Sequence, residues 1–267
     1  MADTVVAIPA LIHIVREVGS YLREEFYRFS RSEAEYKTAR DPVSYVDREA
    51  EKRLKEKCHD LLPEAGFLLE ESGSEAHDQE LLWVIDPLDG TKNFVHGIPL
   101  FAISIALLHH QKPLAGIVYA VLQDEVFWAV RGQGAYLGKE CIRVSDVTDP
   151  DKLLIATGFM YKEPERAERY FQVLNEVMRR FGGLRRLGSA ALDLAYVATG
   201  RMDAFFEMDL HPWDISAGSL IVQEASGKVT DFLGEENYIW EGSIVAGNPW
   251  AHEAVLELIQ QQQLGGK

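Results

Sequence analysis

Cysteine and basic residues are scarce in this sequence. Two cysteines, Cys58 and Cys141, are too few for a disulfide framework or a thiolate zinc site, and they suit a reducing compartment. The chain has 27 Lys and Arg residues against 42 Asp and Glu, which gives a formal charge of −15. Nucleic-acid binding depends on many Lys and Arg contacts to phosphates, so this balance argues against DNA or RNA as the main partner.

Long apolar runs are missing as well. The longest uncharged stretch, residues 93–111, contains Asn93 and Pro99 and therefore predicts a loop and a buried strand rather than a membrane span. Near the N-terminus, Asp3 stands where a signal peptide would carry a basic residue, and Arg16 breaks the apolar stretch. We expect a cytoplasmic protein without a membrane segment.

The 267 residues, 47% of them hydrophobic, are enough to bury a large core without disulfides. In residues 1–148, hydrophobic periodicity predicts two helices, at about 11–26 and 44–61, followed by a largely antiparallel sheet with strands at 67–69, 81–85, 101–108, 114–119 and 126–130. In residues 149–267 it predicts strands at 153–156, 204–207, 228–231 and 243–246 and helices at 164–181, 189–199, 215–225 and from 251. The fold class is an α+β half followed by an α/β half, and we expect the two to share one core and a cleft.

The segment at 83–91 places two carboxylates directly after an apolar strand. In a regular strand Asp86 and Asp89 would point to opposite faces, but Pro87 and Gly90 allow a turn that brings them together. Two carboxylates about 4 Å apart repel by roughly 4 kcal/mol at an effective dielectric near 20, so a cation is expected between them. Oxygen ligands favour Mg²⁺ or Mn²⁺. The alternative is a turn in which both acids bond backbone amides.

Other acids each have an ordinary structural explanation. Glu70 and Glu71 end an apolar strand, where a solvated turn is common. Asp214 opens a helix as a cap would, and Asp47 forms a capping pair with Ser44.

Taken together, these segments resemble a known family. The residues Glu70-Glu71-Ser72, W-V-I-D-P-L-D-G-T at 83–91 and W-D-I-S-A-G at 213–218 are similar to the two signatures of the inositol monophosphatase family. The likeness continues through R-G-Q-G-A-Y at 131–136 and G-S-A-A-L-D-L-A-Y at 188–196. The resemblance implies a layered α/β/α/β/α sandwich of the sugar-phosphatase type, which usually forms a homodimer.

The resemblance also implies a metal site, carried over position by position. Glu70, Asp86 and the Leu88 carbonyl would hold one Mg²⁺ ion. Asp86, Asp89 and Asp214 would hold a second ion, and Glu70 would reach a weaker third one through water.

The same carry-over implies catalytic and substrate-binding roles. Thr91 matches the residue that orients the attacking water, Asp47 matches its acidic partner, Glu70 counts among the catalytic residues, and Glu71 supports the ligands from behind. The residues matched to substrate contacts are Asp89, Gly90, Thr91, Gly188, Ser189, Ala190 and Glu207. Two of them keep simpler alternatives, because Ser189 is also a candidate helix N-cap and Glu207 a candidate exposed strand end.

The implied activity is a Mg²⁺-dependent, lithium-sensitive phosphomonoesterase that hydrolyses myo-inositol monophosphate to inositol and phosphate with metal-activated water. Lys92 departs from the threonine usual in this family and resembles a related branch that acts on 3′-phosphoadenosine 5′-phosphate. Fructose 1,6-bisphosphate and histidinol phosphate are further candidate substrates. The basic pair Arg185-Arg186 is either a solvated surface, a site for a second anionic group or a subunit interface. A non-enzymatic alternative is a regulatory protein that binds a macromolecular partner.

Overall fold

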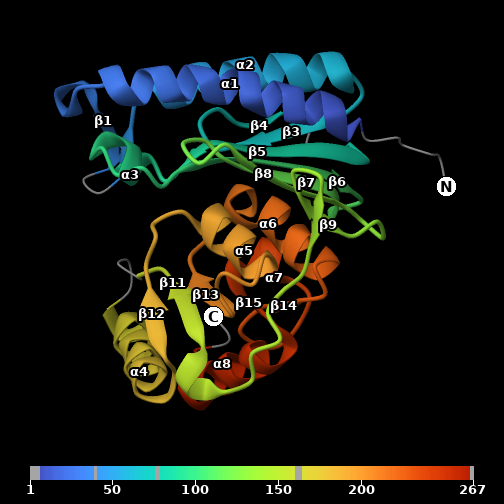
Figure 1. Cartoon of the computed structure of the whole chain (residues 1–267). Coiled ribbons are helices and arrows are strands. Elements are labelled where there is room, and N and C mark those ends of the chain that lie inside the picture. The colour runs from blue at the N-terminus through green and yellow to red at the C-terminus, as the bar shows by residue number, and fades with distance from the viewer. Residues whose placement is uncertain (1–6, 39–40, 76–78, 160–163, 265–267) are drawn as a thin grey trace.

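The computed structural model describes residues 7–38, 41–75, 79–159 and 164–264, and in it helices and sheets alternate in five layers (Figure 1). The helices are α1 (Ile8–Arg28), α2 (Tyr45–Leu61), α3 (Thr91–Val95), α4 (Pro164–Arg180), α5 (Ala190–Ala198), α6 (Pro212–Glu224), α7 (Tyr238–Glu241) and α8 (Pro249–Gln261). The first ten strands are β1 (Glu35–Thr38), β2 (Asp41–Val43), β3 (Gly66–Leu69), β4 (Gly73–Glu75), β5 (Leu81–Asp89), β6 (Ala102–His109), β7 (Lys112–Ala120), β8 (Glu125–Val130), β9 (Ala135–Leu137) and β10 (Glu140–Ile142). The last five are β11 (Leu154–Thr157), β12 (Gly183–Arg185), β13 (Ala204–Met208), β14 (Lys228–Thr230) and β15 (Ser243–Gly247).

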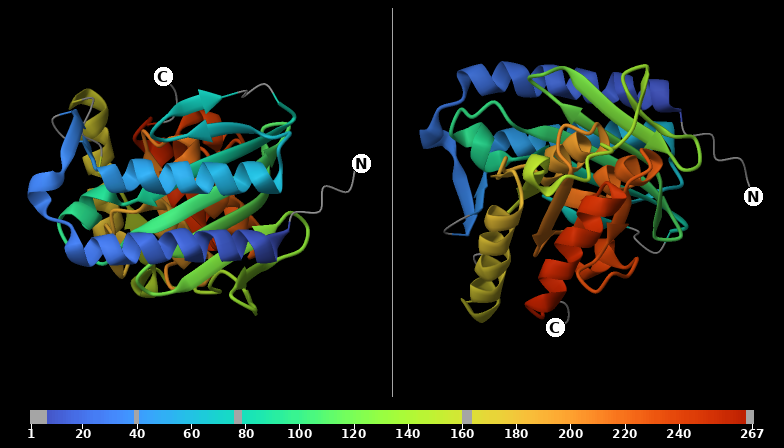
Figure 2. Two further views of the ribbon diagram at one scale, coloured as in Figure 1. Left: turned by 90° about the horizontal axis from the view of Figure 1, so that it is seen from above. Right: turned by 60° about the horizontal axis from the view of Figure 1, so that its bottom comes forward.

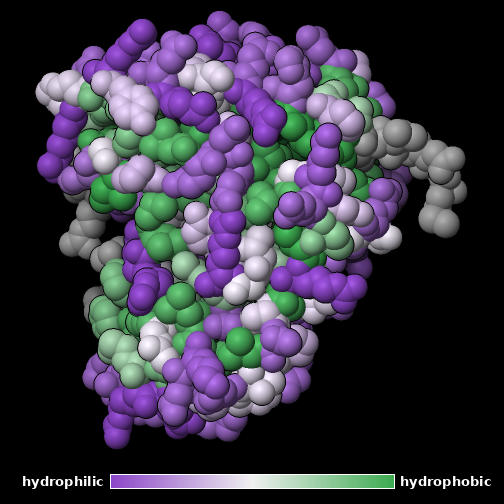
Figure 3. Space-filling view, in the orientation of Figure 1, coloured by the Kyte–Doolittle hydropathy of each residue, from purple (hydrophilic) through white to green (hydrophobic). Residues whose placement is uncertain are grey.

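The outer helices α1 and α2 lie side by side across one face of the first sheet (Figure 2, left). Both are amphipathic, and their apolar stripes, which include Leu11 and Val18 on α1 and Leu54 on α2, are buried against that sheet. Ser44 caps α2 and forms a capping box with Asp47, as the sequence predicts. The outward faces carry the charged residues, so hydrophilic side chains dominate the surface over α1 and α2 in Figure 3.

The first sheet has eight strands in the order β10-β9-β8-β7-β6-β5-β3-β4. Adjacent strands in this sheet are antiparallel except for β3 and β5, which run parallel to each other. The prediction of a largely antiparallel sheet is therefore confirmed. Because β3 and β5 are parallel, the C-terminal ends of both strands reach the same edge of the sheet. That edge carries most of the acidic motifs.

The middle layer contains α5 and α6, which are apolar on nearly all sides because a sheet covers each of their faces. Contact with the first sheet is close: a Cβ added at Gly116 of β7 would lie 2.9 Å from the Cα of Ala217 on α6. One core cluster therefore combines strands from before residue 148 with helices from after it. The division into units 1–148 and 149–267 stays a prediction.

The second sheet has the order β12-β11-β13-β15-β14, with parallel pairing among the first three strands and antiparallel pairing among the rest. Helices α4 and α8 cover its outer face and lie side by side in Figure 2. The layer order α/β/α/β/α confirms the predicted fold class. Short strands such as β4, β9, β10 and β12 were not predicted, because three residues carry too little periodicity to be recognised. Among the described residues, no helix is both long and apolar enough to cross a membrane.

Candidate active site

Asp86 and Asp89 come together through an irregularity in β5. The sequence predicts that the strand ends at Ile85, but it continues to Asp89 with a register shift against β6 between the two acids. Pro87 fits within this shift because it has no N–H to give to the ladder. The Leu88 N–H donates to Asp86 Oδ1 at 2.9 Å, which closes the turn and orients that carboxylate.

Asp214 reaches the same place from the middle layer. It is the third residue of α6, and its Oδ2 accepts a hydrogen bond of 2.6 Å from the His211 N–H at the start of the helix. The Ser104 hydroxyl on β6 donates to the Trp213 carbonyl at 3.0 Å, which ties the beginning of α6 to the first sheet. As a result, one carboxylate oxygen from each of Asp86, Asp89 and Asp214 lies within 4.8 Å of the others.

Glu70 joins the three aspartates from the end of β3. Its backbone N–H donates to the Ile85 carbonyl at 3.3 Å, and its side chain forms a hydrogen bond with Asp86. The next two N–H groups, of Glu71 and Ser72, donate to the buried Glu51 carboxylate at 2.7 and 3.0 Å. Glu51 therefore fixes the loop that presents Glu70. The sequence analysis missed this residue, although its position one helical turn after Asp47 places both on one face of α2.

Burial raises the pKa values of Asp86, Asp89 and Asp214, which together with Glu70 we call the acid cluster. Burial is the largest cause in each resolved case: it raises the pKa of Asp86 and Asp214 well above the ordinary range and that of Asp89 to about 6. The charges of Glu70 and Asp89 raise the pKa of Asp86 further. A cation would relieve both effects, because it removes the repulsion and replaces the lost hydration.

Asp47 and Thr91 lie in direct contact beside the cluster. The Thr91 hydroxyl is 2.9 Å from Asp47 Oδ1 and 3.0 Å from the Leu88 carbonyl oxygen, so its one proton has two acceptors. Ser44 donates to Asp47 Oδ2 from its backbone N–H at 2.9 Å and from its hydroxyl at 2.6 Å. Burial raises the pKa of Asp47, and the hydrogen bonds from Ser44 and Thr91 oppose that rise. The structure thus places the predicted pair together.

Asp89 also connects the first sheet to helix α5 of the middle layer. Its Oδ2 accepts from the Ser189 hydroxyl at 2.6 Å and from the Ala191 N–H at 2.7 Å, and the Ala190 N–H adds a further hydrogen bond. Ser189 is the N-cap of α5, so both the capping role and the contact near the site are present. Gly188 adopts a φ of +88°, and an added Cβ would lie 3.0 Å from the Asn93 side chain. These contacts seat the start of α5 against the acid cluster.

A pocket of about 180 Å³ opens next to the acids. The residues that line it are Asp89, Gly90, Thr91, Lys92, Thr157, Arg186, Gly188, Ser189, Ala190, Glu207, Leu210 and Asp214. All the residues matched to substrate contacts are in this set. Glu71 does not line the pocket. Its negative charge adds to the effect of Glu35 in raising the pKa of Arg48.

Glu207 and Arg186 place a carboxyl group and a guanidinium cation in the same pocket. Burial raises the pKa of Glu207 to about 8, with Arg186 opposing the rise, so this carboxyl is not an ordinary exposed strand end. The backbone approaches it closely at Gly158, where an added Cβ would lie 1.7 Å from Glu207 Oε1. Both arginines are exposed, but only Arg186 lines the pocket, whereas Arg185 donates to the Leu184 carbonyl. The sequence left the role of the pair open, and it missed Thr157 because a lone threonine in a strand carries no signal.

Comparison with known proteins agrees with this geometry. The model of the "Inositol monophosphatase family" matches residues 4–264. The chain is 42% identical to the Nus factor SuhB of Escherichia coli K12 over 246 residues, 92% of each chain. It is 37% identical to the suhB protein of Bartonella henselae, whose crystal structure has a TM-score of 0.90 and covers 95% of this chain and 98% of that one. The IMPase of Thermotoga maritima is 34% identical, with a TM-score of 0.87 and coverage of 97% and 99%. From the fold, the acid cluster and these matches together, the chain belongs to the inositol monophosphatase family.

Proposed function

We propose that this protein is a Mg²⁺-dependent phosphomonoesterase and that its substrate is myo-inositol monophosphate. The proposal depends on three aspartates, two from strand β5 and one from helix α6, whose carboxylate oxygens lie within 4.8 Å of one another beside a pocket of about 180 Å³. A phosphate monoester is itself an anion, so it approaches such an acidic site only when cations reverse the local charge.

The donor set fits Mg²⁺. The ligands would be carboxylates and one carbonyl, with Glu70, Asp86 and the Leu88 oxygen for one ion and Asp86, Asp89 and Asp214 for another. One oxygen of each aspartate is already held by a protein donor, which fixes the orientation of the carboxylate before a cation binds. When bound, Mg²⁺ supplies positive charge to the phosphoryl group and lowers the pKa of water.

Thr91 and Asp47 supply the proton acceptor. If the Leu88 carbonyl is directed to a cation, Asp47 is the remaining acceptor for the Thr91 proton, and the lone pairs of Thr91 Oγ1 are left to accept from the attacking water. The buried, raised-pKa carboxylate of Asp47 then stabilises the positive charge that develops along this chain of hydrogen bonds. No covalent intermediate with the protein is required.

Substrate choice depends on the rest of the pocket. Glu207 and Ser189 offer hydrogen-bonding groups for the hydroxyl groups of a polyol, and Arg186 adds a positive charge to the same pocket. Lys92 also lines the pocket, an observation that keeps 3′-phosphoadenosine 5′-phosphate as a second candidate. Fructose 1,6-bisphosphate and histidinol phosphate remain possible substrates of the same chemistry.

The test is phosphate release in the presence of Mg²⁺ from all four compounds. We expect inositol 1-phosphate to be preferred by about a hundredfold in kcat/KM, which corresponds to about 2.7 kcal/mol of discrimination. Preference for the nucleotide would identify Lys92 as the residue that selects the substrate. Uniformly weak rates would contradict the proposed activity.

A second candidate function is supported by the printed name of several relatives, Nus factor SuhB, which names no phosphorylated substrate. It is a regulatory role in which the fold binds a macromolecular partner. This role predicts that partner binding survives Asp86→Asn and that the wild-type protein releases no detectable phosphate. Phosphate release that disappears in Asp86→Asn would contradict it as the sole role.

We propose two further properties, inhibition by Li⁺ and assembly as a homodimer, from the family resemblance alone. A cytoplasmic location without nucleic acid as a main partner is also proposed, from the scarce cysteines and the net charge of −15. Sedimentation and Li⁺ titration of the turnover rate measure the first two directly.

A further inference from the structure

A second group of metal-binding side chains lies at the opposite end of β5 from the acid cluster. Glu80 directly precedes β5, and His109 and His110 form the end of β6 and the start of the turn to β7. One ligand atom of each lies within 4.8 Å of the other two. None of the three belongs to the pocket beside the acid cluster.

The donor atoms converge on one point. Both imidazole Nε2 atoms approach the same carboxylate oxygen, Glu80 Oε1, at 2.7 Å from His109 and 3.4 Å from His110. The two rings lie against one another with centroids 4.3 Å apart. A tetrahedral zinc ion with ligands at roughly 2.0–2.1 Å holds its donors about 3.3 Å apart, so only small side-chain movements are needed to admit one.

The backbone already holds the three residues together. Residues His110 and Gln111 form a two-residue turn with φ values of +49° and +63°, a conformation for which Asn-Gly is the preferred pair. The His110 N–H donates to the Glu80 carbonyl at 3.0 Å, and Leu81 pairs with His109 across the sheet. Because these segments are fixed, little chain entropy is lost when a ligand binds.

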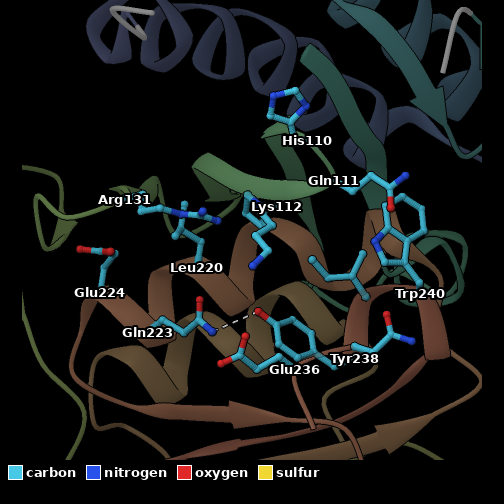
Figure 4. A pocket seen from close by; sticks show the side chains of 13 residues that line it. His110, Gln111, Lys112, Arg131, Leu220, Gln223, Glu224, Glu236, Tyr238 and Trp240 are labelled. Carbon is cyan, nitrogen blue, oxygen red and sulfur yellow. Dashed lines mark hydrogen bonds between the residues drawn. The ribbon is translucent and has the colours of Figure 1, made fainter. Parts of the chain in front are cut away.

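The ligand types differ from those of the acid cluster. Two imidazoles and one carboxylate suit Zn²⁺, Cu²⁺ or Ni²⁺, whereas a set of oxygen ligands suits Mg²⁺. His110 stands at the rim of a separate cavity of about 380 Å³, away from the side chains around Tyr238 (Figure 4). The exposure of all three side chains gives an ion direct access from solvent and leaves room for water in the remaining positions.

We propose that Glu80, His109 and His110 form an exposed site for one late first-row divalent ion, with Zn²⁺ or Cu²⁺ as the ligand class. The ion links the start of β5 to the β6–β7 turn. About 20 Å of extended chain separates Glu80 from Asp86 at about 3.3 Å per residue, so the site is distinct from the acid cluster. The proposal is independent of the proposed phosphatase activity.

The test uses the full chain in excess Mg²⁺, dialysed against Zn²⁺, with bound zinc measured per chain. The variant is His109→Gln with His110→Asn, since Asn tolerates positive φ. The control is His13→Gln with His59→Gln, two exposed histidines of which His13 also faces a glutamate, Glu17. Mutation of a residue that only hydrogen-bonds a metal ligand typically weakens metal binding by about 10–100-fold. Loss of both histidine ligands should therefore weaken zinc binding by at least about a hundredfold.

Cu²⁺ electron paramagnetic resonance adds a structural readout. We expect coupling to two nitrogens in the wild type and in the control, and its loss in the histidine variant. Glu80→Gln should keep both nitrogens and weaken binding by about tenfold. Equal zinc affinity in the wild type and the histidine variant, or a Cu²⁺ spectrum without two nitrogens, would overturn the proposal.

Discussion

Strand β5 has a cluster of charged side chains at each end, and the two clusters differ in burial. At its C-terminal end, Asp86 is almost fully buried, and this burial together with the charges of the neighbouring carboxylates raises its pKa well above the ordinary range. At its N-terminal end, Glu80 is exposed, and a hydrogen bond from His109 together with the charge of His110 lowers its pKa. One strand thus presents acids in two opposite electrostatic states.

The difference shows what makes a cation necessary rather than optional. In the buried cluster, water cannot screen the repulsion between carboxylates, so the folded protein needs protons or metal ions there. In the exposed cluster, solvent screens the charges and opposite-sign partners are present, so an ion adds to an arrangement that is stable without it. The following predictions test this contrast from the largest effect to the smallest.

Substitution of the buried acids should have the largest effect on activity. We expect Asp89→Asn or Asp214→Asn to reduce kcat/KM for the preferred substrate by at least about a thousandfold, because each removes a proposed metal ligand. The folded structure should survive, because each change also removes repulsion. Asp146→Asn, at an exposed position, is the control and should keep full turnover. Full activity in either cluster variant would contradict the two-metal assignment.

The proposed proton acceptor should have a smaller effect. We expect Thr91→Val to lower kcat by about a hundredfold, since it removes the hydroxyl that connects water to Asp47. Thr91→Ser restores that hydroxyl and should recover most of the rate. If valine and serine gave the same kcat, the hydroxyl would have no role in proton transfer.

Without metal, the buried cluster should make stability depend on pH. The pKa of Asp89 is about 6 in the folded state against an ordinary value near 3.9, so the folded protein binds the proton more tightly and stability rises as pH falls through this window. We expect the Tm of the metal-free protein to increase by about 2–4 °C or more between about pH 7 and pH 4.5. Added Mg²⁺ should reduce this rise in Tm, and the metal-free Asp89→Asn variant should show a smaller rise than the metal-free wild type. If the rise were unchanged both with Mg²⁺ and in the variant, the acid cluster would not be its cause.

The exposed cluster should have the smallest effect. Without added transition metal, Glu80→Gln should change Tm by no more than about 1 °C, because surface charge pairs contribute little. A scanning calorimetry comparison with the wild type measures this directly. A loss as large as that from a core substitution would show that solvent does not screen this end of β5.

Several parts of the fold and the site follow from local sequence. The periodicity of α1 and α2, the apolar runs of the central strands and the capping pair of Ser44 and Asp47 each depend on residues close together in the chain. The turn between Asp86 and Asp89 belongs to this class, since Pro87 and the shift in register act over four residues. The extension of β5 beyond Ile85 to Asp89 was not predicted, because it depends on pairing with β6, which lies further along the chain.

The sequence by itself determined which residues are acidic, where helices and strands form, and which family the motifs resemble. Only the tertiary structure decided that Glu51 holds the loop after Glu70, that Arg186 faces the pocket, and that Ser189 bonds Asp89 across 100 residues of chain. The physical reason is range: turns, caps and periodicity are set by neighbours in sequence, whereas these contacts exist because α5 and α6 are packed between two sheets. That packing also sets the burial of the acids, and with it their need for a cation.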